Sequence, residues 1–233
     1  MAARLNDQVD EVIVRKTPLF SGLDEDAAAS LRASMNLIKL KKGQVLFREG
    51  DDGDHLYIVS SGKVKLGTKA PDGRENLLMI LGPGDMFGEL SLFDSGPRTA
   101  SAIAVTDSKV LALGQEKVIP WVREHPQVSL QLLARLASRL RKTNEVVGDL
   151  VFSDVPGRVA KALIDLGVKF GERREEGLYV NHDLTQEELA QLVGASRETV
   201  NKSLADFVAR GWIRLEGRAV VLLDYERLLK RSR

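Results

Sequence analysis

LTQEELAQLVGASRETVNKSL, residues 184–204, is the stretch that decides how the C-terminal part of this chain folds. Thr185 followed by Glu188 predicts an N-cap with a capping box at the start of one helix. Gly194 can adopt the left-handed conformation of a tight turn, and Ser196 can cap the helix that follows. The segment therefore predicts two short helices joined by a tight turn, a helix-turn-helix.

The flanking residues extend this prediction to a winged helix-turn-helix. The sequence predicts helices at residues 158–170, 185–193 and 196–210, followed by strands at 213–215 and 220–223. Glu216-Gly217, between the two strands, suits the turn of a β-hairpin. The second helix of such a motif is the one that enters the major groove of DNA.

Side chains on the first turns of that second helix have the chemistry to read DNA. Arg197 can donate two hydrogen bonds to guanine O6 and N7, and Glu198 can accept one from cytosine N4. Ser196, Thr199 and the helix N-terminus can hold phosphates without reading the sequence. The alternative is an all-helical packing unit in which Arg197 and Glu198 form a surface ion pair. That alternative does not explain an exposed Ser-Arg-Glu-Thr turn beside a hairpin.

A long helix is predicted before this DNA-reading part. Pro120 and Pro126 suit a helix start, and nothing interrupts the pattern from Gln127 until Gly148. One stripe along it repeats with the alternating spacing of an a/d heptad, which is typical of a two-helix seam. The seam residues are Leu130, Leu133, Ala137, Leu140, Asn144, Val147 and Val151.

The seam predicts that two copies of the chain dimerise through this helix. A stripe buried against a second domain of the same chain is the alternative. The polar flank of the helix suits solvent, and it consists of Arg135, Arg139, Arg141, Lys142 and Glu145.

Short β-strands are predicted between residues 38 and 113. They are Val45–Phe47, Leu56–Val59, Val64–Leu66, Leu77–Leu81 and Val110–Leu113, with glycines at most of the connections. Repeated short strands with glycine corners favour an antiparallel barrel or roll. A small alanine-rich helix over 24–35 precedes them.

Residues 87–102, FGELSLFDSGPRTASA, form a candidate anion site between two of these strands. The Gly88–Ser91 stretch can form a short helical turn whose N–H groups point at an anion. Arg98 can place a guanidinium fork against the same anion, and Thr99 adds a hydroxyl. Glu89 suits a phosphate site only if it accepts a hydroxyl such as a ribose 2′-OH. The spacing alone leaves open a surface loop with a solvated ion pair.

Length and composition exclude several classes of protein. A chain of 233 residues suits two domains, and no apolar run is long enough to span a bilayer. The N-terminal MAARLNDQVDEVIV carries acids where a signal peptide would be apolar, so we expect a cytoplasmic protein with no membrane association. Cysteine is absent, and the three histidines are far apart in sequence, so no metal or other cofactor is expected. The net charge of +1 gives no sign of nucleic-acid binding, so that prediction depends on the motifs.

The sequence resembles the cyclic AMP receptor protein (CRP/FNR) family over nearly its whole length, and it is most similar to the actinobacterial branch. Phe87-Gly-Glu-Leu with Arg98-Thr-Ala is similar to that family's phosphate-binding cassette. Val193–Val200 is similar to its recognition helix, and Asp154–Arg158 is similar to the hinge that opens its DNA domain.

The resemblance implies an α+β chain with three parts. Residues 1–118 would form an antiparallel, jelly-roll-like cyclic-nucleotide-binding domain. Residues 119–153 would form the dimerisation helix and hinge, and residues 154–233 the winged helix-turn-helix domain. The implied function is a cyclic AMP-responsive transcription regulator that acts as a homodimer on palindromic TGTGA-type sites in double-stranded DNA, with RNA polymerase as a further partner.

Site residues carried over from the resemblance fall into two sets. Cyclic AMP would be bound by Gly88, Glu89, Leu90, Ser91, Arg98, Thr99, Thr143 and Asn144, the last two facing the adenine across the dimer. DNA would be contacted by Thr185, Gln186, Ser196, Arg197, Glu198, Thr199, Asn201 and Lys202. Lys202 stands where the family often has arginine, whose bidentate fork lysine cannot reproduce, so the exact half-site stays open. Asn144 stands where a serine can occur, which leaves effector discrimination open.

Two other functions compete with this one. A family member that does not need cyclic AMP would keep the fold; Glu89 and Arg98 argue against it, because both are costly to bury without a ligand. An enzyme controlled by a cyclic-nucleotide domain would need a catalytic dyad or metal cluster, which the sequence does not show.

Overall fold

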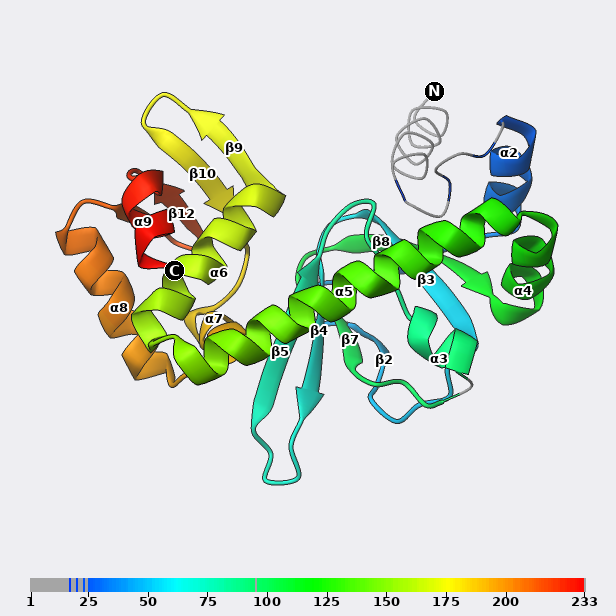
Figure 1. Cartoon of the computed structure of the whole chain (residues 1–233), viewed down its shortest axis with the longest axis horizontal. Coiled ribbons are helices and arrows are strands. Elements are labelled where there is room, and N and C mark those ends of the chain that lie inside the picture. Colours follow the sequence, from blue (N-terminus) through cyan, green and yellow to red (C-terminus); the bar gives the residue numbers. More distant parts are fainter. Residues whose placement is uncertain (1–16, 18–19, 21–22, 24, 95, 233) are drawn as a thin grey trace. The chain divides into compact units, whose positions relative to one another are not determined.

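The computed structural model describes residues 17, 20, 23, 25–94 and 96–232 (Figure 1). The chain divides into two compact units. One comprises Met1–Lys69 with Leu78–Arg141, and the other Ala70–Leu77 with Lys142–Arg233. The N-terminal segment MAARLNDQVDEVIV, expected not to be a signal peptide, lies outside the described residues.

Two four-stranded sheets form the roll in the N-terminal part of the chain. The strand orders are β1-β8-β3-β6 and β2-β7-β4-β5. The strands are β1 Asn36–Leu40, β2 Val45–Phe47, β3 His55–Ser61, β4 Val64–Lys69, β5 Glu75–Leu81, β6 Met86–Phe87, β7 Ser101–Ala104 and β8 Ser108–Gly114. The pairs of β8 with β1 and β3, and of β7 with β2 and β4, are antiparallel. The predicted antiparallel roll and all five predicted strands are confirmed; β1, β6 and β7 were not predicted.

The alternation of side chains along β8 explains how the roll is packed. Successive residues of a strand point to opposite faces of the sheet. Val110 and Ala112 join a buried cluster supplied by strands of both sheets. Leu111 and Leu113 join a second cluster, with side chains from the helices that cover the other face. Strand β8 is therefore buried on both sides, as its nearly continuous apolar sequence requires.

The covering helices are α2 Glu25–Ala33, α3 Glu89–Asp94, α4 Gln115–Glu124 and the long α5 Pro126–Phe152. Pro126 begins α5 as predicted, but Pro120 lies inside α4, where it removes one backbone hydrogen bond. Gly148 is the first residue that could interrupt the predicted helix, but α5 extends past it to Phe152, and the predicted seam through Val151 is helical throughout. A glycine inside a helix costs only about 1 kcal/mol relative to alanine, so α5 continues for another turn.

Helix α5 presents two different faces. Val128 and Leu132 are buried against the roll. The apolar seam residues lie on another stripe, and the larger ones are more than half exposed in the single chain: Leu130, Leu133, Leu140, Val147 and Val151. The seam is therefore an uncovered apolar surface on this chain.

The second unit contains the helix-turn-helix. Its elements are α6 Val155–Phe170, β9 Gly171–Arg174, β10 Gly177–Asn181, α7 Gln186–Val193, α8 Arg197–Ala209, β11 Ile213–Glu216, β12 Ala219–Leu222 and α9 Tyr225–Arg231. The predicted hairpin is β11–β12, and it belongs to a larger sheet of order β11-β12-β10-β9. Strands β9 and β10 and helix α9 were not predicted. Helix α6 begins three residues earlier than predicted, because the Asp154 side chain caps it.

Candidate functional site

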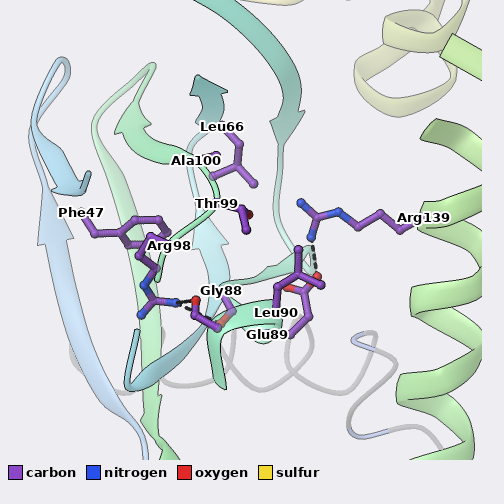
Figure 2. Close-up of a pocket in the computed structure, with 10 residues that line it drawn as sticks. Phe47, Leu66, Gly88, Glu89, Leu90, Arg98, Thr99, Ala100 and Arg139 are labelled. Atoms are coloured by element: carbon purple, nitrogen blue, oxygen red, sulfur yellow. Dashed lines mark hydrogen bonds and ion pairs between the residues drawn. The ribbon is translucent and has the colours of Figure 1, made fainter. Parts of the chain in front are cut away.

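A pocket lies at the Phe87–Ala100 cassette, between β6 and β7 (Figure 2). Its volume is about 290 Å³, part of which is open to solvent. It is lined by Phe47, Leu66, Gly88, Glu89, Leu90, Ser91, Arg98, Thr99, Ala100 and Arg139. Gly88 has a φ of +83°, and a Cβ there would lie 2.7 Å from Arg98 Nη1 and 2.9 Å from the His55 oxygen. Only glycine fits this position, so the backbone can approach the arginine closely.

Arg98 is almost completely buried and held from several sides. Its Nη1 donates to the Gly88 oxygen at 2.9 Å and to Ser91 Oγ at 3.3 Å, and its Nη2 donates to the His55 oxygen at 2.9 Å. The guanidinium carbon lies 4.4 Å from the centre of the Phe47 ring, as Figure 2 shows. Its Nε is buried and has no hydrogen-bond partner among the residues that the structure describes.

Glu89 lies on the opposite side of the pocket and is 2% exposed. One carboxylate oxygen, Oε1, accepts from Nη1 of Arg139, which reaches it from α5 (Figure 2). The other, Oε2, is buried and unpartnered within the described part of the chain. Because Arg139 neutralises it, burial of Glu89 does not by itself require a ligand, contrary to the expectation from the sequence.

The predicted solvent role for the α5 flank is wrong for two arginines. Arg139 pairs with Glu89, and Arg135 donates to Asp85 at 3.1 Å. Both arginines continue the face of α5 that buries Val128 and Leu132, at spacings of three and four residues. That periodicity is the signal that could have predicted Arg139 as a second cation of the pocket.

Six of the eight predicted cyclic AMP contacts line this pocket: Gly88, Glu89, Leu90, Ser91, Arg98 and Thr99. Thr143 and Asn144 are exposed residues farther along α5, in the second unit, and are not among the lining residues of the single chain. Phe47, Leu66, Ala100 and Arg139 were not predicted. Phe47 comes from β2 and Leu66 from β4, and Ala100 directly precedes β7. The sequence pattern gives no sign that these three border a pocket.

Two neighbours of Arg98 carry shifted pKa values. Burial raises the pKa of the Tyr57 phenol above its usual range, so this side chain is neutral beneath the guanidinium. The hydrogen bond from the His55 imidazole lowers the pKa of the Asp54 carboxyl. Asp54 is therefore a carboxylate at neutral pH.

The helix-turn-helix has the local geometry that its sequence predicts. Thr185 Oγ1 accepts from the Glu188 N–H at 3.1 Å, and Glu188 Oε2 accepts from the Thr185 N–H at 2.8 Å, which completes the capping box. Gly194 has a φ of +67° and ends α7 in the left-handed conformation. Ser196 Oγ accepts from the Thr199 N–H at 3.2 Å and caps α8. These caps, with buried Leu189, Val200 and Leu204, fix α8 against α7.

The predicted DNA-contacting side chains lie mostly on the exposed surface of this motif. The exposed ones are Gln186, Ser196, Arg197, Glu198, Thr199 and Lys202, and Thr185 is half-buried as the cap of α7. Asn201 is also half-buried, and its Oδ1 is buried without a partner in the part of the chain that the structure describes. The Oδ1 atom of Asn201 is therefore not accessible at the surface.

Known proteins share both halves of this arrangement. Residues 37–125 match the cyclic nucleotide-binding domain family, and residues 157–231 match the Crp-like helix-turn-helix domain family. The chain is 53% identical over 225 residues to the "CRP-like cAMP-activated global transcriptional regulator" of Mycobacterium tuberculosis, covering 97% of this chain and 100% of that protein. This chain belongs to the CRP family of transcription regulators.

Other members of the CRP family are also similar. The "cAMP-activated global transcriptional regulator CRP" of Escherichia coli is 32% identical over 186 residues, covering 79% of this chain and 88% of that protein. The crystal structure of the Thermus thermophilus catabolite activator protein matches with a TM-score of 0.54 and 36% identity, covering 93% and 98% of the two chains. The proteins in these matches are transcription regulators rather than enzymes.

Two further observations describe this family member. Among the described residues, no helix is both long enough and apolar enough to cross a membrane. The same residues include no group of three His, Asp or Glu side chains placed to hold a metal ion.

Proposed function

We propose that this protein is a cyclic AMP-responsive, sequence-specific transcription regulator that acts as a homodimer on palindromic TGTGA-type sites. The proposed layout is a cyclic-nucleotide-binding domain over 1–118, a dimerisation helix and hinge over 119–153, and a winged helix-turn-helix domain over 154–233. The protein is proposed to act in the cytoplasm, where DNA and RNA polymerase, its further proposed partner, are found.

The observation that carries the cyclic AMP proposal is a pair of buried, unpartnered atoms in one pocket. Glu89 Oε2 is an acceptor and Arg98 Nε is a donor, and neither has a partner among the described residues. A buried polar atom without a partner costs free energy that a ligand can recover. A ligand with one hydroxyl and one nearby anionic oxygen fits this pair, and the ribose 2′-OH and cyclic phosphate of cyclic AMP supply both.

Arg139 adds specificity to this proposal. It pairs with one carboxylate oxygen of Glu89, and the other oxygen is left to accept a hydrogen bond from a ligand hydroxyl. A carboxylate in an anion site disfavours a second phosphate near it, because like charges repel. The pocket therefore favours a nucleotide with a single phosphate charge over one with a free triphosphate.

Homodimerisation is supported by the uncovered seam on α5. The exposed seam side chains repeat with the heptad spacing that two parallel helices need. Asn144 lies in this seam, where a polar residue sets the register. In the proposed dimer Thr143 and Asn144 face the adenine, one from each subunit, as the family resemblance implies.

DNA reading is proposed to depend on Arg197, Glu198 and Lys202. Their side chains make no hydrogen bond or ion pair with any residue that the structure describes, which leaves the charged groups available. Ser196, Thr199, Thr185 and Gln186 are proposed to hold the DNA backbone. Asn201 is proposed as a weaker DNA contact, because its side chain is half-buried.

One titration tests the proposed function. Full-length protein is added to a labelled TGTGA palindrome and to a scrambled duplex, with and without cyclic AMP, and fluorescence anisotropy is measured. We expect tight binding only to the palindrome and only with cyclic AMP, and loss of the response in Arg98→Ala. Equal binding to the palindrome with and without cyclic AMP would support the regulator that does not need cyclic AMP. Equal binding to both duplexes would contradict sequence-specific reading.

A further inference from the structure

The segment Gly50–His55 runs along the inner side of Arg98, outside the phosphate-binding cassette. We infer that this segment positions the Arg98 guanidinium for the ligand's phosphate. The absence of a side chain at Gly53 leaves room for the side chains of Ser91 and Arg98, which lie against it. This inference rests on the proposed cyclic AMP function, because it assigns to that site a group of residues beyond the cassette.

Two backbone hydrogen bonds from this segment hold the main chain of Arg98. The Gly50 N–H donates to the Arg98 oxygen at 2.8 Å, and the Arg98 N–H donates to the Asp51 oxygen at 2.8 Å. The Asp51 side chain accepts from the Arg48 N–H at 2.7 Å, which closes the turn before the segment. Both polar backbone groups of Arg98 are thus held by two consecutive residues, so its Cα cannot shift without breaking them.

The guanidinium is held by the other end of the same segment. The His55 oxygen accepts from Arg98 Nη2 at 2.9 Å. The His55 ring bonds the Asp54 carboxylate through Nδ1 at 2.6 Å and stacks on Tyr57 with 6.1 Å between ring centres. The guanidinium carbon lies 5.4 Å from the centre of the same Tyr57 ring. His55 therefore fixes both the carbonyl that accepts from Arg98 and the ring on which Arg98 lies.

Gly53 lies between these two anchors and has no room for a side chain. A Cβ on Gly53 would overlap Cβ and Oγ of Ser91 and would lie 3.2 Å from Arg98 Nε. Because Cβ is the fixed root of the Ser91 side chain, a rotamer change cannot relieve the overlap. The φ of Gly53 does not lie in the left-handed region, so the requirement for glycine here comes from packing and not from backbone strain.

The free edge of the guanidinium explains why this packing matters for binding. Nη1 and Nη2 are already held by Gly88, Ser91 and His55, whereas Nε is buried without a described partner. Nε is also the atom that a side chain at Gly53 would approach. An added methyl group would therefore displace the one edge of Arg98 that is free to meet a phosphate oxygen.

The test is calorimetric titration of full-length protein with cyclic AMP. The variants are Gly53→Ala, Ser91→Gly, the swapped pair Gly53→Ala/Ser91→Gly, Arg98→Lys, and Gly53→Ala/Arg98→Lys. Asp52→Asn is the matched control, since Asp52 is an exposed neighbour in the same segment with none of these contacts. Thermal unfolding without ligand checks that each variant is folded.

We expect Gly53→Ala to lose about tenfold or more in affinity while remaining folded, as overpacking next to a binding group does. The swapped pair should recover most of the loss relative to Ser91→Gly alone, because the overlapping side chain is gone. In the Arg98→Lys background, Gly53→Ala should lower the affinity for cyclic AMP by less than about threefold. The reason is that the guanidinium which Gly53 helps to position is absent from this background. Asp52→Asn should bind as the wild type does.

Two results would overturn the inference. One is Gly53→Ala binding within about twofold of the wild type. The other is the same loss in the Arg98→Lys background as in the wild type, which would mean that Gly53 acts on the pocket in general. A wild type that does not bind cyclic AMP at all would instead overturn the proposed function, so the two failures are distinguishable.

Discussion

We predict that base reading by α8 depends most directly on Arg197. It occupies the first position of the helix, is exposed, and has no partner among the described residues. We expect Arg197→Ala to weaken binding to a specific site by about 1–3 kcal/mol and to relax the preference at one guanine. Anisotropy titrations on a set of duplexes substituted at single positions measure both effects.

Thr199→Ala is the control for this prediction. Thr199 lies one helical turn after Ser196, the N-cap of α8, and the two hydroxyls are hydrogen-bonded at 2.9 Å. Its removal should weaken all sequences nearly alike, because a phosphate contact carries no sequence information. If Arg197→Ala also lost the same affinity on specific and random DNA, Arg197 would be a phosphate contact and not a base contact.

Single residues were predictable where their role is local in the chain. Thr185, Gly194 and Ser196 were assigned from spacing alone, because caps and turns involve residues three or four positions apart. The Arg139–Glu89 pair joins residues 50 positions apart, and no local rule connects them. The same holds for the His55 carbonyl beneath Arg98, which is a backbone group without a sequence signature.

At the scale of elements, two ion pairs attach α5 to the roll. Glu89 is almost fully buried, so Arg139→Ala would leave its carboxylate without a cation. We expect this variant to lower the free energy of unfolding by about 3–5 kcal/mol, the cost typical of breaking one side of a buried pair. Denaturant titration of the full chain measures it.

Glu89→Gln in the Arg139→Ala background separates charge from packing. A neutral amide is much cheaper to bury than an unpaired carboxylate, so the double variant should be more stable than Arg139→Ala alone. Arg141→Ala serves as control, since Arg141 is an exposed residue of the same helix. A double variant that is less stable than Arg139→Ala would contradict the role of Arg139 as the counter-ion of Glu89.

The start of α6 responds to acid. Asp154 accepts from the Gly157 N–H at 2.9 Å and pairs with Arg231 at 2.5 Å, and these contacts, the Arg231 bond above all, lower the pKa of Asp154. A carboxyl whose pKa is lower in the folded state stabilises the fold above its unfolded pKa and loses that effect as pH falls through the folded pKa. The DNA-binding unit should therefore lose stability below about pH 4.

Asp154→Asn isolates this charge, because asparagine is also a good N-cap. Thermal unfolding of both proteins should show the wild type more stable at about pH 5–6. The difference should shrink toward about pH 3, where the wild-type carboxyl becomes protonated. The ion pair is partly exposed, so the effect should be small and should fall with added salt. A difference that does not change with pH would show that the cap alone matters.

Elements with a strong period were predictable, and short polar ones were not. The apolar heptad of α5 and the apolar runs of the roll strands each extend over enough residues to predict these elements from the sequence. Strand β9 and the turn that follows it have the polar sequence GERREE, in which no apolar alternation appears. Strand β9 is held by pairing with β10, which also pairs with β12. Helix α5 extends past Gly148 to Phe152 because one glycine is a weak helix breaker when the flanking turns are stable.

At the scale of the whole molecule, the exposed seam predicts a parallel dimer. Leu133→Glu or Leu140→Glu would place charges in the seam and should convert the protein to a monomer at micromolar concentration, measured by analytical ultracentrifugation. A dimer with two-fold symmetry should bind half-sites whose centres lie about 34 Å apart, one helical turn of DNA. A wild-type monomer at that concentration, or single half-sites bound as tightly as full sites, would contradict the proposed assembly.

We predict that binding of cyclic AMP and binding of DNA are coupled. Asn144 lies in the seam, where a polar residue costs stability but fixes register, and the family resemblance places it against the adenine bound to the other subunit. Cyclic AMP is therefore expected to tighten the seam around residues 140–150 and to reposition the DNA-binding domains through the hinge at 154–158. By linkage, DNA must then raise the affinity for cyclic AMP by the same factor by which cyclic AMP raises the affinity for DNA.

Asn144→Ala should retain the dimer, because alanine is tolerated in a helical seam. It should, however, reduce toward one the factor by which each ligand raises the affinity for the other. The measurement is a thermodynamic cycle in which cyclic AMP affinity is determined with and without a specific duplex, and DNA affinity with and without cyclic AMP. Leu130→Ala is a control at a seam position far from the hinge, and it should weaken the dimer without abolishing the coupling. If Asn144→Ala coupled the two ligands as strongly as the wild type does, Asn144 would be only a register device. Cyclic AMP would then have to reach the DNA-binding domains by a route that does not pass through the polar position of the seam.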